Sequence, residues 1–419
     1  MHIQLLTLGS RGDVQPYVAL GAALKARGHT VTVTTGQGFD DMIEEQGLVS
    51  APISADVRRM LQDPLVQDAL NSFSGKIKAY RALKGDIGNQ IDEAWRLVRD
   101  ARPDVLVYHQ KMGAAATFGA QLGIPALPSY LIPGMVATSA YPFPLLPVSS
   151  LGKTGNRLSH GLIRWTTNRF YLPLVTRWRR ERLPDLQGPA FDPFEGFDPA
   201  GRPPLRLHAF SAHVVPKPAD WDDRDRVTGY WFQDAASDRE PTGELRDFLD
   251  AGPPPVYVGF GSMPAADAGA MTRVVLEALE RTGQRGVLAT VWGGLEKTVV
   301  PDTVFMLETA RHDWLFPRCS AVVHHGGAGT THEGLRWGRP TVICPFGVDQ
   351  PFWGRRVAAL GAGPDPLPRK SLTADRLAAA LAATREHALI TRAEDVGAAI
   401  RTEGGAADAA KAIERFAAA

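Results

Sequence analysis

The sequence predicts an α/β protein of two Rossmann-like domains that face each other across a cleft. Two observations carry this prediction: short apolar segments alternate with helical ones in both halves of the chain, and a polar segment containing Pro and Gly separates the halves. Repeated strand–helix–strand units form a parallel sheet with helices on both faces. Ligands of such sheets bind at the carboxyl ends of the strands, so we expect the site in the interdomain cleft.

The overall composition narrows the class of protein. The chain has 419 residues, enough for two cores, and 46 Lys and Arg against 45 Asp and Glu give a net charge of +1. Binding to nucleic acid by bulk electrostatics needs a basic surplus, so no such partner is expected. Cys319 and Cys344 lie in apolar runs, which fits a reducing, cytoplasmic location. No apolar run reaches the roughly 18 residues of a membrane span, and "MHIQLLTLGS" is interpreted as a strand, not a secretory signal.

In the first half, strands are expected where short runs of apolar and β-branched residues occur. The expected strands are residues 3–8, 29–35, 104–109 and 124–130. A turn over residues 9–13 follows the first strand, and a helix runs from about Pro16 to Gly28, since glycine favours a helix end. A further helix is expected just before the fourth strand, in "GAAATFGAQLG".

Two unusual segments follow these elements. Residues 125–147 are rich in Pro and apolar side chains, which is interpreted as the wall of an apolar pocket, with ordinary core packing as the alternative. Residues 157–182 carry seven arginines against Glu181 alone. One face of the helix expected there carries Leu158, Leu162, Trp165 and Leu172. This pattern is typical of a helix on a membrane surface, although most such helices pack on a core with their charges in solvent.

The alternation restarts after a polar segment, residues 233–254, which is interpreted as the interdomain linker. The expected domains therefore cover residues 1–232 and 255–392, and residues 393–419 form a C-terminal helix. The second domain has expected strands in "VYVGFGS", "RGVLATVWG", "AVVHHGG" and "PTVICPF" and expected helices in "AGAMTRVVLEALERTG" and "GTTHEGLRWG".

The strongest motif is "AVVHHGGAGTTHEGLRWGRPTVICPFGVDQPFWGRRV", residues 321–357. A strand ends at His325, a glycine-rich turn follows, and a helix begins at Thr330. Amides at a helix N-terminus, together with hydroxyls and an imidazole, form an anion site suited to a diphosphate. Glu333, one turn into the helix, can accept two hydrogen bonds from a ribose diol, and Asp349 with Gln350 can bind sugar hydroxyls.

Two arrangements that could suggest a metal ion are interpreted otherwise. His325 and His332 are seven residues apart, but the glycines near them break the helical phase and no third ligand is evident. Asp223 and Asp225 form an Asp-x-Asp pair that we assign to a surface loop leading into a strand at "VTGYWF". No metal site is expected.

The motif of residues 321–357 resembles the donor-binding signature of nucleotide-sugar glycosyltransferases with the GT-B fold. The chain is similar to the UDP-glycosyltransferase family, and within it to sterol 3-β-glucosyltransferases and actinobacterial, vancomycin-type natural-product glycosyltransferases. The shared motifs run in the same order from Gly9 to about Leu381: "GSRGDVQPYVALG", "FGSMP", "WGGL", "HDWLF", "HHGGAGTT" and "PFWGRRV". The resemblance is weakest over residues 57–100 and 151–220, on the acceptor side.

The resemblance implies an inverting, metal-independent enzyme without a cofactor. It would transfer a sugar, glucose from UDP-glucose, to a hydroxyl of a lipophilic acceptor such as a sterol or polyketide, giving a β-glycoside. Residues 1–232 would bind the acceptor, residues 255–392 would bind the nucleotide sugar, and the helix within residues 393–419 would pack back on the first domain.

The same resemblance implies the residues of the donor site. The donor-binding residues would be Ser262, His325, Gly327, Ala328, Gly329, Thr330, Glu333, Asp349 and Gln350. A second group of candidates near the donor is Ser10, Arg11, Gly12, Gly261, Trp292, Ala310, His312 and Trp314.

Asp13 stands where many relatives carry a catalytic histidine. A carboxylate with an ordinary pKa near 3.9 is ionised at neutral pH and can accept the proton of an attacking hydroxyl. The alternative interpretation is a helix N-cap, since Asp is favoured there. We assign Asp13 as the catalytic base.

Two other functions compete with glycosyl transfer. A dinucleotide-dependent oxidoreductase also has a glycine-rich first turn, but "GSRGD" lacks the G-x-G-x-x-G pattern and no suitable acidic residue closes the second strand. A protein that binds the sugar nucleotide without catalysis is the other alternative. The presence of Asp13 together with Glu333, Asp349 and Gln350 argues against it.

Overall fold

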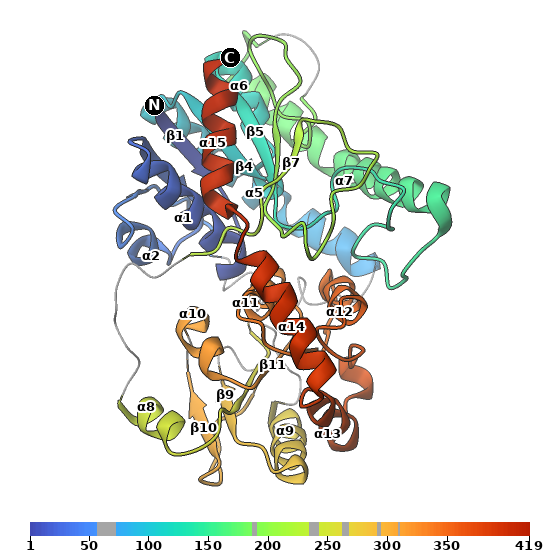
Figure 1. The fold of residues 1–419 in the computed structure, drawn as a ribbon. Coiled ribbons are helices and arrows are strands. Elements are labelled where there is room, and N and C mark those ends of the chain that lie inside the picture. The colour runs from blue at the N-terminus through green and yellow to red at the C-terminus, as the bar shows by residue number, and fades with distance from the viewer. Residues whose placement is uncertain (57–72, 187–190, 234–242, 262–267, 291–294, 309–310) are drawn as a thin grey trace.

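Two parallel β-sheets, each covered by helices, make up the protein in a computed structural model that describes residues 1–56, 73–186, 191–233, 243–261, 268–290, 295–308 and 311–419. Figure 1 shows the sheet of the first half above that of the second half. The predicted α/β class with two Rossmann-like domains is confirmed. In the described part of the chain, no helix is both long enough and apolar enough to cross a membrane.

The first sheet has seven parallel strands in the order β3-β2-β1-β4-β5-β6-β7. They are β1 (His2–Leu6), β2 (Thr30–Thr34), β3 (Val49–Ser50), β4 (Val105–His109), β5 (Ala126–Tyr130), β6 (Arg206–His208) and β7 (Asp225–Val227). The apolar residues alternate between its faces: Leu5 packs with α1 (Arg11–Ala26), and Leu6 packs with α5 (Phe73–Ala101) and α6 (Ala115–Leu122). Both faces are therefore buried, as a parallel sheet requires.

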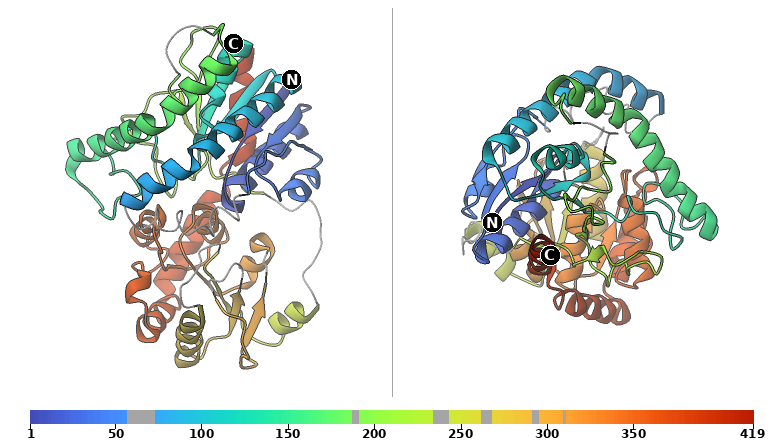
Figure 2. Two further views of the ribbon diagram at one scale, coloured as in Figure 1. Left: turned by 180° about the vertical axis from the view of Figure 1, so that it is seen from behind. Right: turned by 90° about the horizontal axis from the view of Figure 1, so that it is seen from above.

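The longest described helix of the first domain is α7 (Gly152–Arg182), which runs beside α5 and projects beyond the sheet (Figure 2). Only part of α7 is anchored in the core, because Val175 and Trp178 pack against Trp95 and Phe118 while the N-terminal half projects. The other helical elements in the described part of this domain are α2 (Asp40–Glu44) and η1 (Gln110–Met112).

The second sheet has five parallel strands in the order β10-β9-β8-β11-β12. They are β8 (Val256–Gly259), β9 (Gly286–Ala289), β10 (Val304–Leu307), β11 (Ala321–His324) and β12 (Thr341–Ile343). Its helical elements are α8 (Gly243–Asp250), α9 (Ala268–Thr282), α10 (His312–Leu315), η3 (Phe316–Arg318), α11 (Ala328–Arg336), α12 (Gln350–Ala359), η4 (Arg369–Ser371) and α13 (Ala374–Ala383).

The C-terminal segment forms two helices where the sequence suggested one. α14 (His387–Ile400) packs on α11 of the second domain, and α15 (Gly405–Ala418) packs along α1 of the first (Figure 1). Gly405, with φ of +53°, lies at the junction between them, in a region that favours glycine. The predicted boundaries at 232, 254 and 392 remain a prediction.

The structure corrects three local predictions. The first helix begins at Arg11 rather than near Pro16, because Ser10 caps it and Asp13 lies in its first turn. The strand expected in "VTGYWF" instead covers Asp225–Val227, so Asp225 is buried and paired with Arg206 and His208 rather than placed in a surface loop. The short strands β3, β6 and β10 were not predicted, because two to four residues carry too little periodicity.

The docking of α15 gives a first testable prediction. Ile413 of α15 is fully buried in the core that α15 shares with α1 and the first sheet. Ile413→Ala should therefore lower the free energy of unfolding by about 2–5 kcal/mol, measured by urea denaturation. Arg415→Ala, an exposed position of the same helix, is the control and should stay within about 0.5 kcal/mol. Equal effects of the two variants would contradict this packing.

Candidate active site

Both sheets reverse their chain order at one place, and polar residues gather at both reversals. In the first sheet β1 and β4 are neighbours although β2 and β3 lie between them in sequence, and in the second sheet β8 and β11 are related in the same way. Crevices open at the carboxyl ends of such strand pairs. Asp13 and Lys111 follow β1 and β4, and Gly261 and His325 follow β8 and β11.

Asp13 is held by hydrogen bonds at the N-terminus of α1. One carboxylate oxygen, Oδ2, accepts the backbone N–H of Ser10 at 2.8 Å and the Ser10 hydroxyl at 3.1 Å. The hydroxyl of Thr7 donates to the Asp13 carbonyl at 2.8 Å. Asp13 is thus not the N-cap but the third helical residue, and it returns a bond to the N-cap as in a capping box.

The other oxygen of Asp13 faces β4. Lys111 Nζ donates to Oδ1 at 2.8 Å, and His109 Nε2 lies 3.9 Å from the same oxygen. Burial opposes ionisation of Asp13, but Lys111, His109 and the Ser10 amide outweigh it and lower its pKa below the ordinary value. Burial and the Lys111 charge lower the pKa of His109 to about 3, so its imidazole is neutral. Asp13 is therefore an ionised carboxylate over the neutral pH range.

Gly9 is required by the position of Asp13. A Cβ at Gly9 would lie 2.1 Å from Asp13 Oδ2 and 2.7 Å from Lys111 Nζ, and the φ of +148° also disfavours other residues. Gly12 lies in the first turn of α1 beneath Ser10, with no close contact that a Cβ would violate.

Arg11 reaches across toward the second domain. Its guanidinium donates to the Gln15 side chain at 3.0 Å. Burial lowers the pKa of Arg11, while the nearby Asp313 of α10 raises it, so the two residues lie within electrostatic range across the cleft. The same Arg11 charge contributes, after burial, to lowering the pKa of His312 to about 3.

The glycine-rich turn after β11 is built around His325. Its ring lies between Gly261 and Gly327: a Cβ at either glycine would come within 2.7 Å of the imidazole. Burial lowers the pKa of His325 to about 4, so the ring is neutral, and its buried Nδ1 has no hydrogen-bond partner among the described residues. An unsatisfied polar atom in such a turn is typical of a ligand site. His324, fully buried behind it, accepts the Gly326 N–H at 2.9 Å.

The turn leads directly into the N-terminus of α11. Gly327 is the N-cap, and Ala328, Gly329 and Thr330 are the first helical residues, whose amides have no partner within the helix. Glu333, one turn further, accepts the Trp337 indole N–H at 2.7 Å. The geometry matches a site for an anion at the helix end.

Asp349 and Gln350 begin α12. Asp349 Oδ2 accepts the Trp353 indole N–H at 2.7 Å, and Gln350 Oε1 accepts the amides of Phe346 and Gly347 at 2.7 and 3.1 Å. Burial raises the pKa of Asp349, the Trp353 hydrogen bond opposes the rise, and the negative charge of Asp13 adds to it. Asp13 and Asp349 thus interact across the two domains.

The remaining candidates divide into two groups. His312 stacks on Phe316 with ring centres 4.4 Å apart and contacts the Tyr257 hydroxyl at 3.2 Å. The Arg318 guanidinium lies over the Trp314 ring, 4.0 Å from the ring centre. Trp314 also lines a hollow to which residues of α8 contribute. Three candidates lie outside the described residues: Ser262, Trp292 and Ala310.

Residues from both domains meet behind the turn. His332 Nε2 accepts the Ser211 N–H at 3.2 Å, and Tyr230 stacks on the His332 ring with centres 4.6 Å apart. Tyr230 also limits Gly329, where a Cβ would lie 2.8 Å from the Tyr230 hydroxyl. His332 therefore joins the domains, and no group of three or more His, Cys, Asp or Glu among the described residues is arranged to hold a metal ion.

Lys111, His109 and Tyr230 were not among the sequence-predicted site residues. No motif marks them, but His109 ends the strand "DVLVYH" and Lys111 lies two residues beyond it, and polar residues at the end of an apolar strand are the signal that points to the carboxyl edge of a sheet. Tyr230 carries no such signal, because its contact depends on how the two domains pack.

The pairing of Asp13 with Lys111 predicts a shifted titration. In Lys111→Met the favourable charge is lost while the burial of Asp13 remains, so the pKa of Asp13 should rise. The carboxyl NMR signal of Asp13, assigned with Asp13→Asn in protein carrying labelled aspartate, measures this change. Lys25→Met, remote on α1, should leave the titration unchanged; an unchanged midpoint in Lys111→Met would show that the ammonium does not control Asp13.

Two family models match the chain. Residues 3–135 match the glycosyltransferase family 28 N-terminal domain, and residues 288–413 match the erythromycin biosynthesis protein CIII-like C-terminal domain. The matched ranges contain Asp13 and Lys111 in the first domain and His325 to Gln350 in the second.

Solved structures match over the whole chain. The calicheamicin glycosyltransferase CalG4 superposes with a TM-score of 0.72 at 19% identity, covering 99% of this chain and 98% of that one. The Streptomyces glycosyltransferase SsfS6, complexed with thymidine diphosphate, superposes with a TM-score of 0.63 at 20% identity, covering 99% of each chain. These matches establish the GT-B fold.

Curated relatives share higher identity. The Arabidopsis thaliana sterol 3-beta-glucosyltransferases UGT80A2 and UGT80B1 are 35% and 32% identical over 99% of this chain, which spans 65% and 68% of their lengths. The sterol 3-beta-glucosyltransferase of Emericella nidulans is 35% identical, and the chain spans 30% of that longer protein. By these matches and its two-domain structure, the chain belongs to the sterol 3-beta-glucosyltransferase family of GT-B glycosyltransferases.

Proposed function

We propose that the protein is an inverting, metal-independent glycosyltransferase that moves glucose from UDP-glucose to a hydroxyl of a lipophilic acceptor. One observation carries the proposal: each sheet reverses its strand order once, with the Asp13–Lys111 pair at the reversal of the first sheet and the glycine turn of His325 at that of the second. A base on one domain and an anion site on the other would together serve transfer between two bound substrates.

The donor would lie on the second domain. The amides of Gly327 to Thr330 and the His325 ring would hold the diphosphate, and Glu333 would accept hydrogen bonds from the ribose. Asp349 would accept from sugar hydroxyls, while the NH₂ group of Gln350 would donate, because its oxygen is already bonded to the loop. Ser262, Trp292 and Ala310 keep their predicted donor roles as part of this proposal.

Asp13 would act as general base. As the acceptor oxygen attacks the anomeric carbon, its proton passes to Asp13, the bond between that carbon and the diphosphate oxygen breaks, and the electron pair leaves with UDP. Attack from the face opposite the diphosphate converts an α-linked donor into a β-glycoside. The positive end of α11 and the neutral His325 would stabilise the leaving diphosphate without a metal ion.

Lys111 would set the lowest pH at which Asp13 is ionised and can act as the base. The ammonium occupies Asp13 Oδ1 and lowers the pKa of the carboxyl group. The acceptor hydroxyl would take the place of Lys111 on that oxygen. Because the Lys111 side chain is half exposed, water would solvate its ammonium when the acceptor takes this place.

The acceptor would lie on the first domain, against the apolar segment after β5. Tyr141 of that segment packs on Phe352 of α12, with ring centres 5.7 Å apart, so the segment lies beside the helix that begins with the sugar-binding pair. The Arabidopsis relatives are named for sterols, whereas CalG4 is named for calicheamicin. We propose a sterol or polyketide-type acceptor.

The nucleobase needs a direct test, because SsfS6 is complexed with thymidine diphosphate. Transfer from UDP-glucose and TDP-glucose to a panel of sterols and polyketides, read by mass spectrometry, tests donor and acceptor together. The competing oxidoreductase function is not favoured by the comparisons. Thermal-shift titration with UDP and NAD separates the two.

We also propose that the enzyme acts in the cytoplasm and meets its lipophilic acceptor at a membrane surface, through residues 157–182. Support comes from the exposed apolar and basic side chains of α7.

Asp13→Asn should lower kcat for transfer by about 10²–10⁴-fold, because the amide cannot accept the proton. UDP binding, measured by calorimetry, should change little since Asp13 lies on the other domain. Asp104→Asn, on the opposite edge of the same sheet, is the matched control. Near-normal transfer by Asp13→Asn would overturn the base assignment.

His325→Ala should weaken UDP binding about tenfold to a hundredfold, which is the range for a lost hydrogen bond to a charged group. Titration calorimetry with UDP measures the effect. His387→Ala, an exposed position on α14, is the control. If both variants bind UDP equally, the diphosphate does not lie on the glycine turn.

A further inference from the structure

The exposed apolar side chains of the protein are concentrated on one segment. Among the described residues, eleven large hydrophobic side chains are exposed, and seven of them lie between residues 145 and 170. These seven are Leu145, Val148, Leu151, Leu158, Leu162, Trp165 and Phe170. Contiguous apolar surface on a folded protein marks an interaction site rather than chance exposure.

Three of these exposed side chains belong to a regular row along α7, which we call the α7 stripe. Its members recur every three or four residues and so share one helix face: Leu158, Leu162, Trp165, Arg169, Leu172, Thr176 and Arg180. Leu158, Leu162 and Trp165 are 60–67% exposed, which is unusual for such side chains. The row is apolar toward the projecting end of the helix and basic toward its other end.

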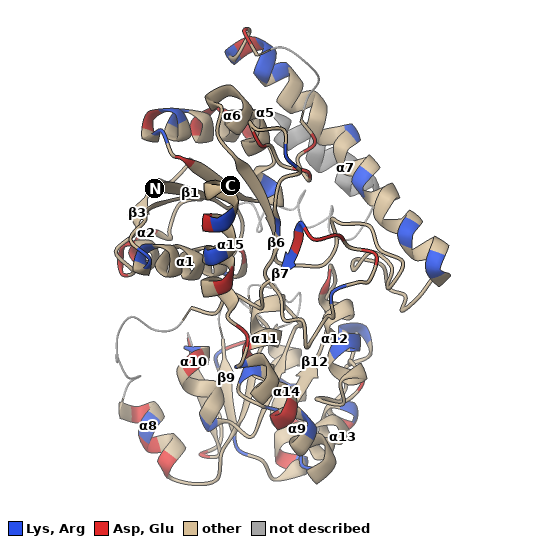
Figure 3. Ribbon diagram, turned by 45° about the horizontal axis from the view of Figure 1, so that its top comes forward, with Lys and Arg blue, Asp and Glu red and all other residues tan. Residues whose placement is uncertain are grey.

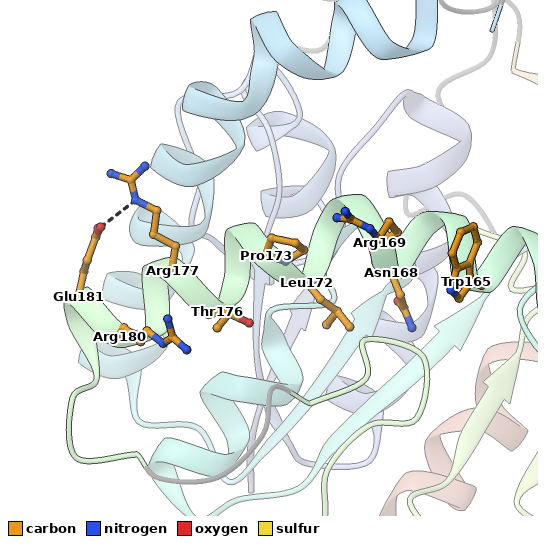
Figure 4. A pocket seen from close by; sticks show the side chains of 9 residues that line it. All are labelled: Trp165, Asn168, Arg169, Leu172, Pro173, Thr176, Arg177, Arg180 and Glu181. Carbon is orange, nitrogen blue, oxygen red and sulfur yellow. Dashed lines mark hydrogen bonds and ion pairs between the residues drawn. The ribbon is translucent and has the colours of Figure 1, made fainter.

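The basic half of the stripe borders a shallow hollow of about 780 Å³ (Figure 4). Trp165 and Leu172 line it together with Arg169 and Arg180, and Arg177 at its edge is paired with Glu181. Arg169 and Arg180 make no ion pair within the described part of the chain. The hollow is therefore lined by apolar side chains and by two guanidinium groups, those of Arg169 and Arg180, that no carboxylate in the described part of the chain neutralises.

The charge of α7 is exceptional for this protein. Residues 152–182 contain eight Lys and Arg and the single acid Glu181, whereas the whole chain has a net charge of +1. Figure 3 shows this row of basic residues along the projecting helix. Some of the arginines are used internally, such as Arg164 with Asp192 and Arg182 with Asp92, and these lie away from the stripe.

We propose that the α7 stripe, with the apolar residues 145–151 before it, docks on a bilayer surface that contains anionic phospholipids. Leucines and a tryptophan enter the boundary between headgroups and acyl chains, while arginines of the same face contact lipid phosphates. A second copy of this chain is a poorer occupant, because the stripe contains no acidic residue, so a two-fold contact through it would bury Arg169 and Arg180 without an opposite charge.

The docked surface is connected to the cleft. On its buried side, α7 holds the segment that follows β5: the Ser159 hydroxyl accepts the Phe143 N–H at 2.8 Å, and the His160 ring contacts the carbonyls of Gly134 and Tyr141. Arg355 of α12 donates to the Leu146 carbonyl at 3.2 Å. The docking itself does not depend on the proposed function, but its use does: if the protein is a glycosyltransferase, a lipophilic acceptor would pass from the bilayer along this segment to Asp13.

Vesicle flotation of the full chain tests the docking without any enzyme assay. Phosphatidylcholine vesicles with about 30% phosphatidylglycerol should bind the protein at least tenfold better than pure phosphatidylcholine, and salt should weaken the binding. Leu158→Ser/Leu162→Ser/Trp165→Ser should lose binding to both. Arg169→Gln/Arg180→Gln should lose the preference for anionic lipid. Lys411→Gln/Arg415→Gln on α15 removes the same charge elsewhere and should bind like the wild type.

Three results would overturn the proposal: no binding by the wild type, unchanged binding by the apolar triple variant, or a concentration-dependent dimer that the triple variant abolishes. The last would assign the stripe to a second copy. Thermal melting of the triple variant checks that it is folded, which is expected for substitutions at exposed positions. Glucose transfer to a short, water-soluble acceptor should be unchanged in the triple variant; absence of transfer by the wild type would count against the proposed function and leave the flotation result standing.

Discussion

The candidate site depends on one interface, the apolar contact between the two domains. A continuous cluster of buried residues contains Tyr130 and Phe210 from the first domain and Trp353 and Ile400 from the second. Hydrogen bonds fix the relative orientation of the two domains: the Arg356 guanidinium of the second donates twice to the Val214 carbonyl of the first, at 2.8 and 2.7 Å. Each half of the site is built within its own domain, so only this interface determines how far Asp13 lies from the glycine turn.

Within each half, the side chains are positioned by short backbone contacts at strand ends. Asp13 rests on Gly9 and the Ser10 amide, and His325 rests between Gly261 and Gly327. Such groups are oriented before a ligand arrives, so little reorganisation is needed on binding. The glycines are therefore as much a part of the site as the residues with functional groups.

Much of this arrangement could be predicted from the sequence. The alternation of strands and helices predicts both sheets. The motif of residues 321–357 predicts the glycine-rich turn after His325 and the position of Asp349 and Gln350 just after a strand. The sequence places the start of α1 too late, because a proline usually marks a helix start, whereas Pro16 lies inside α1 as its sixth residue. Lys111 and Tyr230 were missed for a physical reason: their partners are distant in sequence, and contacts made by tertiary packing leave no local periodicity.

The return of the chain to its first domain has a mechanical consequence. The backbone passes from α14 to α15 at residues 401–404, where Glu403 accepts hydrogen bonds from the Ser211 hydroxyl and the Ala212 N–H of the first domain. These bonds tie the end of α14, which packs on the second domain, directly to the first domain. The domains cannot slide past each other at this crossing without breaking them, so a cleft that widens to admit substrates would open away from residues 401–404.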